Sequence, residues 1–106
     1  MDRAMGFYSA VFDFQFERDT IDHNDMALFP FDSTGSGISG ALAKGSIYKP
    51  SLEGSLIYFR TINIQETMAR VTRNGGMVLY PITSIGDKRF VAEFKDSEGN
   101  RIGLLE

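Results

Sequence analysis

The sequence has no cysteine and only one histidine among its 106 residues. It therefore offers no disulfide framework, no thiolate metal site and no cysteine nucleophile. A Ser/His/acid arrangement has only His23 to draw on, and a metal site needs several converging ligands. Because His23 stands alone in a polar segment, the sequence predicts a solvated loop histidine there rather than a metal ligand or a general base.

Basic residues and long apolar runs are also scarce. The chain has 11 Lys and Arg against 14 Asp and Glu, a net charge of -3, so it has no electrostatic attraction for nucleic acid or for an anionic membrane surface. No window approaches the roughly 18 apolar residues of a membrane span, and the start of the sequence lacks the apolar stretch of a signal peptide. The sequence predicts a cytoplasmic protein of one domain, residues 1–106, with no nucleic-acid or membrane partner.

Helical periodicity occurs twice. Ala4, Tyr8 and Val11 recur at helical spacing, which predicts a helix from about Arg3 to Phe12 with Asp2 as its N-cap.

A second helix is predicted over Ile64–Arg73, with the helix ending at Gly75. Asn63 precedes this helix and Glu66 lies in its first turn, at the spacing of a capping box.

Alternating or β-rich segments predict the strands. They are a strand at Phe14 and Phe16, Met26–Phe31, Ile38–Ala43, Ser55–Arg60, Met77–Tyr80 with Pro81 closing it, Phe90–Lys95 and Arg101–Leu105. Between them the polar segment Asp19–Asp25 predicts a turn, Ser33–Gly37 a loop, Gly45–Gly54 the connection between two halves, and Asp96–Asn100 a tight reversal.

The order of these elements is helix and three strands, then strand, helix and three strands. The second half is a complete βαβββ unit, whereas the first lacks the opening strand. We therefore predict an α+β fold of two modules, the first at about 1–48 and the second at about 55–106. A ferredoxin-like βαββαβ arrangement, the main alternative, has fewer strands after each helix.

Three segments resemble the vicinal oxygen chelate superfamily, which includes glyoxalase I, bleomycin-resistance proteins and extradiol dioxygenases. Phe90–Glu106 is similar to its closing hairpin, Arg3–Phe14 to its first helix and Asn74–Gly76 to the end of its second. The resemblance implies paired βαβββ modules whose strands form a curved mixed sheet around a cavity.

The same resemblance implies metal ligands on the first and last strands of each module, and this sequence departs from that pattern. Leu56 occupies the place of a ligand histidine, and Gly103 occupies the place of the final ligand glutamate. In the first module the opening strand is missing, and no Asp, Glu or His lies between Asp32 and Glu53. We therefore expect no metal and no other cofactor.

Candidate ligand-binding residues lie on the strands of the second module, and no catalytic residue is assigned. They are Tyr58, Arg60, Phe90, Ala92, Phe94 and Gly103. An arginine could hold an anionic group while a tyrosine ring stacks on an apolar one, although exposed strand positions are the more common explanation for Tyr58 and Arg60. Simple core packing likewise explains the apolar side of Phe90–Phe94.

Three functions remain open at this point. The first is a metal-independent protein of the glyoxalase/bleomycin-resistance type that binds a small apolar or planar molecule in the sheet cavity. The second is a glyoxalase-like lyase or isomerase, or a dioxygenase, with non-standard metal ligands. The third is a degenerate structural subunit. We also expect a homodimer, because an absent opening strand leaves an unpaired edge, although a truncated start explains the same gap.

Overall fold

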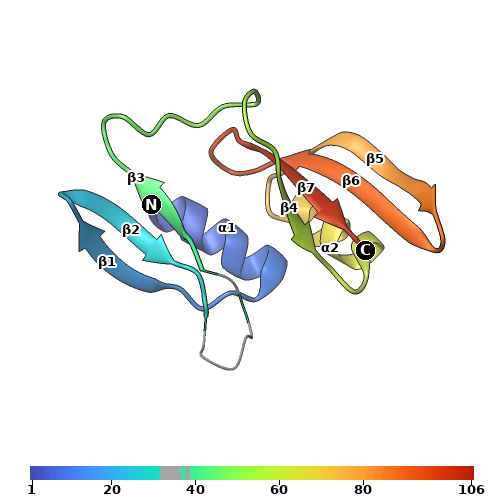
Figure 1. Ribbon diagram of the computed structural model, residues 1–106, viewed down its shortest axis with the longest axis horizontal. Helices are drawn as coiled ribbons and strands as arrows, with labels where there is room; N and C mark the ends of the chain where they lie inside the picture. The colour runs from blue at the N-terminus through green and yellow to red at the C-terminus, as the bar shows by residue number, and fades with distance from the viewer. Residues whose placement is uncertain (32–36, 38) are drawn as a thin grey trace. The chain divides into compact units, whose positions relative to one another are not determined.

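The computed structural model describes residues 1–31, 37 and 39–106. Its helices and strands are α1 (Asp2–Phe12), β1 (Glu17–Ile21), β2 (Asn24–Leu28), β3 (Ala41–Lys44), β4 (Ile57–Arg60), α2 (Ile64–Arg73), β5 (Met77–Gly86), β6 (Arg89–Lys95) and β7 (Arg101–Leu105). The fold is α+β, as predicted, and the chain divides into two compact units, Met1–Lys49 and Pro50–Glu106 (Figure 1).

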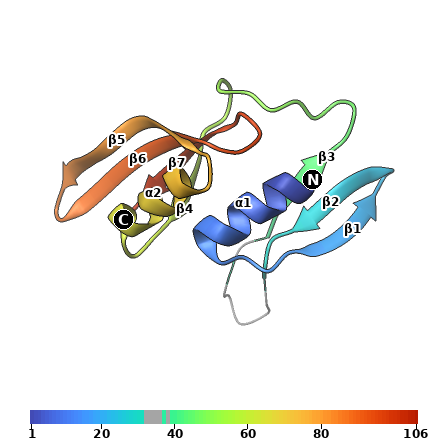
Figure 2. The same ribbon diagram turned by 180° about the vertical axis from the view of Figure 1, so that it is seen from behind.

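The first unit consists of α1 and an antiparallel sheet in the order β1-β2-β3. Figure 2 shows α1 lying in front of these strands. The buried side chains of the helix are Ala4, Phe7, Tyr8 and Val11. They recur at the predicted helical spacing, and Ala27 of β2 is also fully buried. One apolar stripe of α1 therefore forms the core of this unit.

Aromatic rings fill the segment between α1 and β1. The rings of Phe12 and Phe14 stack at a centroid distance of 5.2 Å, and Phe14 meets Phe29 edge-on at 5.5 Å. Phe16 lies 5.5 Å from the same Phe29 ring. The predicted strand at Phe14 and Phe16 is wrong, because these residues pack as a ring cluster and regular pairing begins only at Glu17.

The predicted turn over Asp19–Asp25 is also too long. β1 and β2 pair up to Ile21 and Asn24, so the turn itself is only Asp22 and His23, whose φ angles are 50° and 64°. Positive φ at both central residues is the type I′ geometry that suits the twist of a hairpin. All five residues of β1 are exposed, which explains why a polar segment forms a strand. His23 lies exposed in this turn.

Arg18 joins β1 to both β2 and α1. Its Nε and Nη2 donate to the two carboxylate oxygens of Asp25 at 2.8 and 2.7 Å, and its Nη1 donates to Asp2 at 2.6 Å. Asp2 is the first residue of α1, and Met1 is its N-cap, so the prediction of Asp2 as the cap is wrong. The carboxylate of Asp2 is engaged by Arg18 instead.

The ion pairs of Arg18 with Asp2 and Asp25 should make the stability of the first unit depend on pH. Hydrogen bonds from Arg18 hold the pKa of the Asp25 carboxyl below its usual value of 3.8. A lowered folded-state pKa adds stability above the unfolded-state pKa, and this stability is lost as the pH falls through the folded-state value. We expect Arg18→Gln to lower the melting temperature above about pH 5 and to have progressively less effect below about pH 4.

Thermal unfolding of both proteins from pH 2 to pH 7 measures this difference. Arg70→Gln is the control: it removes one contact of 3.3 Å with Glu66 on α2, whereas Arg18→Gln removes three hydrogen bonds of 2.6–2.8 Å, so the control should change stability less. A difference between wild type and Arg18→Gln that grows as the pH falls would contradict the prediction.

The second unit has the strand order β4-β7-β6-β5. β4 and β7 are parallel, and the other neighbours are antiparallel. In Figure 2, α2 lies in front of this sheet. The buried core residues of the unit are Ile64, Met68, Val71, Ala92, Phe94, Ile102 and Leu104. This is the predicted βαβββ unit, with one helix covering one sheet face.

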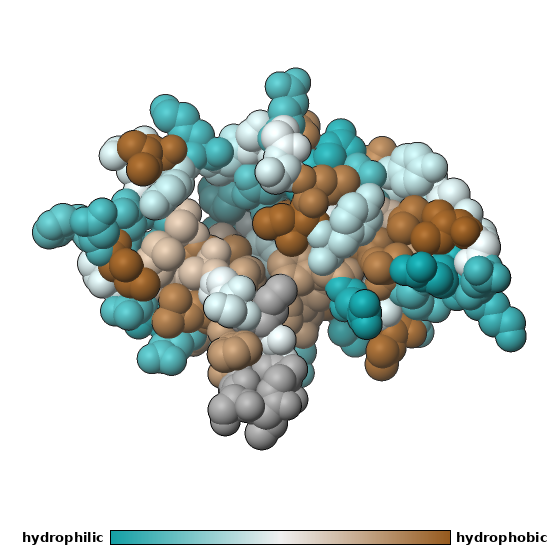
Figure 3. All heavy atoms as spheres, in the orientation of Figure 1, coloured by the Kyte–Doolittle hydropathy of each residue, from teal (hydrophilic) through white to brown (hydrophobic). Residues whose placement is uncertain are grey.

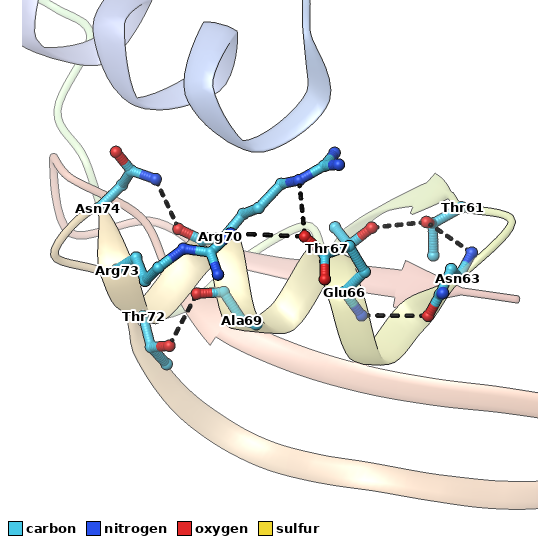
Figure 4. A network of polar contacts seen from close by, with 9 residues as sticks. All are labelled: Thr61, Asn63, Glu66, Thr67, Ala69, Arg70, Thr72, Arg73 and Asn74. Carbon is cyan, nitrogen blue, oxygen red and sulfur yellow. Dashed lines mark hydrogen bonds and ion pairs between the residues drawn. The ribbon is translucent and has the colours of Figure 1, made fainter.

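The bounds of α2 agree with the prediction because its start is determined locally. The Asn63 side chain accepts a hydrogen bond from the Glu66 amide at 3.1 Å (Figure 4). The carboxylate of Glu66 pairs with Arg70 and Arg73, at 3.3 and 3.4 Å. A second carboxylate reaches the helix start, because Glu106 Oε1 accepts from the Ile64 amide at 2.6 Å. Acceptors at an N-terminus satisfy amides that have no partner within the helix.

β5 is longer than predicted, because it continues through Pro81 to Gly86. β5 is an edge strand, where a proline need not remove a ladder hydrogen bond, and its register shifts between Tyr80 and Thr83. Asp87 and Lys88, with φ of 51° and 59°, then form a second tight turn.

Other strand bounds shift less. β3 begins at Ala41 and β4 at Ile57, a few residues inside the predicted ranges. The predicted loop over Ser33–Gly37 lies, except for Gly37, outside the described residues.

The predicted reversal between β6 and β7 is confirmed, and Asp96 organises it. Asp96 is only 3% exposed, and its Oδ1 accepts from the amides of Glu98 and Asn100 at 2.8 and 2.9 Å. Its Oδ2 accepts from the Asn100 side chain at 3.1 Å. Asn100 in turn accepts from the Ser51 amide at 3.1 Å. The buried carboxylate of Asp96 thus stabilises the turn, and the side chain of Asn100 links the turn to the segment before β4.

Candidate functional site

The sheet of the second unit has two faces of different character. Phe94 is registered with Ile102, and Ala92 with Leu104, and all four are buried on the side of α2. Side chains alternate along a strand, so the intervening residues face away from the helix. The register aligns them in one row across the sheet, Tyr58–Gly103–Glu93–Tyr80. We call this side, defined by the row together with Arg60 and Arg101, the open face. Figure 1 views it from the front.

On the open face, the ring of Tyr58 lies against the backbone of Gly103. A Cβ atom built on Gly103 would lie 2.5 Å from both Cδ1 and Cε1 of the Tyr58 ring. Such a distance is far below van der Waals contact, so only glycine permits the ring to lie against this stretch of β7. The ring remains 46% exposed. Tyr58 therefore forms an accessible aromatic surface over the middle of the sheet.

A charged pair lies next to this aromatic surface. Arg101 Nη1 donates to Glu93 Oε1 at 2.7 Å, and the two side chains are 35% and 19% exposed. Arg101 Nε also donates to the Leu52 carbonyl at 3.2 Å. Neither residue is among the candidate residues predicted from the sequence. The alternation of Phe90–Lys95 and the predicted hairpin register together place Glu93 and Arg101 on one face, so these two patterns could have identified the pair.

The six predicted ligand-binding residues do not share one face. Tyr58 and Gly103 are in contact, and Arg60, registered with Leu105, lies on the same face as Tyr58. Ala92 and Phe94 are 0% exposed and lie on the other face.

Phe90 is half-buried and borders a small recess of about 160 Å³ at the start of α2. This recess is lined by Asn63, Ile64, Gln65, Ile82, Phe90 and Glu106. The recess shares no lining residue with the open face, and within it the Glu106 carboxylate accepts a hydrogen bond from the first amide of the helix.

The open face does not offer the donor set of a metal centre. Leu56 and Gly103 have no ligating side-chain atom, and the Tyr58 ring covers the backbone of Gly103. In residues 1–31, 37 and 39–106, no group of three or more His, Cys, Asp or Glu side chains is placed to hold a metal ion. Divalent metals in proteins need several converging N, O or S ligands. The residues at these positions therefore do not fit the group that the resemblance implies.

Apolar side chains also reach the surface of this unit. Figure 3 shows brown, hydrophobic groups beside teal, polar ones over the strands of the second unit. The exposed large hydrophobic residues of the sheet strands are Ile57, Tyr58, Met77, Val78, Tyr80 and Ile85. Of these, Tyr58 and Tyr80 belong to the row of the open face, whereas Ile57 and Val78 are registered with Ile102 and Phe94 on the side of α2.

The family of the chain follows from comparison with known proteins. Residues 1–104 match the family model of the Glyoxalase/Bleomycin resistance protein/Dioxygenase superfamily. The chain belongs to this superfamily, as the sequence motifs predicted. No curated protein matches the sequence.

Solved structures of the superfamily share the fold. A member from Sphaerobacter thermophilus is 24% identical with a TM-score of 0.70, and the match covers 99% of this chain and 86% of that one. A domain from Frankia sp. EAN1pec is 15% identical with a TM-score of 0.73 over 99% and 87% of the two chains.

The fosfomycin resistance protein FosX from Listeria monocytogenes is 13% identical with a TM-score of 0.70, over 98% of this chain and 79% of that one. At these identities the similarity shows the fold alone. As for the helices of this fold, neither one in the described part of the chain is long and apolar enough to cross a membrane.

Proposed function

We propose that this protein binds a small apolar or planar molecule on the open face of its second unit, without a metal ion. The observation that supports this most directly is the contact of the Tyr58 ring with Gly103. The Tyr58 ring therefore covers Gly103, the position at which related proteins would place a carboxylate ligand. Stacking of a flat molecule on such a ring is favourable and needs no metal.

The neighbouring residues support the same proposal. Arg60 is exposed at the end of β4, on the same face as Tyr58. A guanidinium at that place can donate hydrogen bonds to a polar substituent of the bound molecule. Ala92 and Phe94 take no direct part, because they are buried under the same strands. They hold the sheet against α2 and so keep the binding surface rigid.

Replacing Tyr58 by alanine should weaken ligand binding much more than it weakens the fold. The half-exposed ring contributes little to the core, and truncating such a residue costs about 1 kcal/mol or less. Losing an aromatic contact at the centre of a binding site lowers affinity about tenfold or more. Affinities for planar aromatic compounds that raise the melting temperature of the wild type measure this effect.

Tyr48→Ala is the matched control, because Tyr48 is also 46% exposed but belongs to the first unit. An equal loss of affinity in both variants, or unfolding of Tyr58→Ala, would contradict the proposed site. Near-stoichiometric metal retained after dialysis would favour the alternative function, a lyase, isomerase or dioxygenase with other ligands. A panel in which no compound changes the melting temperature would favour a structural subunit.

We further propose that the protein is a homodimer. β4 has β7 as its neighbour on one side and no other strand among the described residues, and Ile57 on it is 57% exposed. A free strand edge with apolar side chains favours pairing with another chain, and a two-fold dimer closes it. Light scattering at micromolar concentration should give twice the chain mass of 11.8 kDa.

The variant Ile57→Lys should shift the dimer toward the monomer, because a charge on an edge strand opposes edge pairing. Ile62→Lys is the control, since Ile62 is 98% exposed and lies outside β4. A mass near that of one chain at all concentrations would refute the dimer.

A further inference from the structure

The ion pair of Glu93 and Arg101 is the part of the open face that the proposed function leaves without a role. Glu93 is registered with Gly103, and Arg101 precedes Gly103 by two residues on β7. Both side chains therefore border the place where the Tyr58 ring crosses the sheet. They are partly accessible, at 19% and 35% exposed.

Each partner keeps hydrogen-bonding capacity after the pair has formed. Arg101 uses Nη1 for Glu93 and Nε for the Leu52 carbonyl. Arg101 Nη2 and Glu93 Oε2 make no hydrogen bond within the described part of the chain. The two existing bonds hold the planar guanidinium on both sides, so its remaining donors point in a fixed direction.

At the ion pair itself, the two opposite charges select against ions. A ligand cation that approaches Glu93 also meets the positive Arg101, and a ligand anion that approaches Arg101 also meets the negative Glu93. An uncharged group with a donor and an acceptor side by side satisfies both atoms without repulsion. A carboxamide or the edge of a lactam ring is such a group.

The spacing suits a flat molecule of one or two fused rings. Neighbouring strands lie about 4.8 Å apart, so the Tyr58 ring above β7 lies about one strand spacing from Glu93 on β6. On the far side of Glu93, Tyr80 of β5 is 44% exposed and borders the row.

We propose that the open face recognises a neutral planar molecule that stacks on Tyr58 and presents a lactam or carboxamide edge to Glu93 and Arg101. The N–H group of the ligand donates to Glu93 Oε2, and its carbonyl accepts from Arg101 Nη2. This inference rests on the proposed function and names the ligand class for the same site.

The test is a titration of the isotope-labelled full chain with four planar probes, followed by NMR at the Gly103 amide. The probes are 2-quinolone, N-methyl-2-quinolone, quinoline-2-carboxylate and 2-(aminomethyl)naphthalene. We expect 2-quinolone to shift the Gly103 signal and to bind at least about tenfold more tightly than the other three. The methylated probe lacks the donor, and a partner left unpaired in a site costs affinity.

Two conservative variants test whether the Glu93–Arg101 pair causes the preference for 2-quinolone. Glu93→Gln removes the charge, and Arg101→Lys keeps the charge but loses the planar fork. Each should reduce the preference for 2-quinolone over its methylated form to less than about threefold. Glu66→Gln and Arg73→Lys, which alter the exposed pair on α2, should leave it unchanged. The NMR spectrum shows whether each variant is folded, and either folded variant suffices for the test.

The outcomes separate this inference from the proposed function. If all four probes shift the Gly103 signal with similar affinity, the binding site is supported and the lactam preference is wrong. If the preference persists in both variants, the pair does not hydrogen-bond to the lactam edge of the ligand and the inference is wrong. If no probe binds at millimolar concentration, the inference is again wrong, and the wider panel of planar compounds decides the proposed function.

Discussion

Phe94→Ala should lower the free energy of unfolding by about 3–5 kcal/mol, the usual cost of emptying a fully buried phenylalanine site. Phe94 is 0% exposed, lies one residue before the end of β6 and is registered with Ile102 of β7 on the side of α2. The large cavity would have β-sheet backbone on one side and a helix on the other, neither of which can move in to fill it. Denaturation in urea, followed by circular dichroism, measures the change.

Phe90→Ala provides the comparison, because Phe90 lies on the same strand and is only half-buried. Its truncation should cost clearly less than that of Phe94. If Phe94→Ala instead remained within about 1 kcal/mol of the wild type and lost ligand binding, Phe94 would belong to the binding site and not to the core.

Asp96→Ala should be the second most damaging substitution, at about 3 kcal/mol. The carboxylate is 3% exposed and accepts hydrogen bonds from two amides and from the Asn100 side chain. Hydrogen bonds to a charged group contribute about 1.5–3 kcal/mol each, and their removal leaves donors unpaired. Urea denaturation again provides the measurement, and Asp96→Asn should show a smaller loss because its amide oxygen still accepts.

Asp87→Ala is the matched control at a turn, because Asp87 is exposed between β5 and β6 and has a φ of 51°. Its substitution adds strain in the left-handed region but leaves no buried donor unpaired. A loss at Asp96 no larger than the loss at Asp87 would show that the hydrogen bonds of the Asp96 carboxylate add little.

Features decided by neighbours in the sequence could be predicted. The second helix has the predicted bounds, because its apolar spacing and its cap at Asn63 lie within a few residues. The reversal at Asp96–Asn100 was predicted for the same reason, since its side chains bond to their own turn.

Features decided by distant parts of the chain were missed. All five residues of β1 are exposed, so its sequence has no apolar alternation to reveal it. The continuation of β5 through Pro81 was not predicted, because only the sheet order shows that this strand lies at an edge.

The same limit applies to the candidate site. Alternation in Phe90–Lys95 correctly separates an apolar side from a polar one, but it does not say which side α2 covers. The structure places Ala92 and Phe94 beneath the helix, and leaves Glu93 on the open face with Tyr58 and Gly103. The close approach of the Tyr58 ring to Gly103 depends on parallel pairing of β4 with β7, which no local pattern predicts.

The position of β7 between β4 and β6 has a consequence for synthesis in the cell. β7 follows the other elements of its unit along the chain, yet it joins the first strand of that unit to the β5–β6 hairpin. While a ribosome is still adding Arg101–Leu105, β4 has no partner in the unit and β6 has one open edge. The segment after Lys49 can therefore complete its sheet only in a single late step, and until then the nascent chain exposes the edges of β4 and β6 that β7 later pairs.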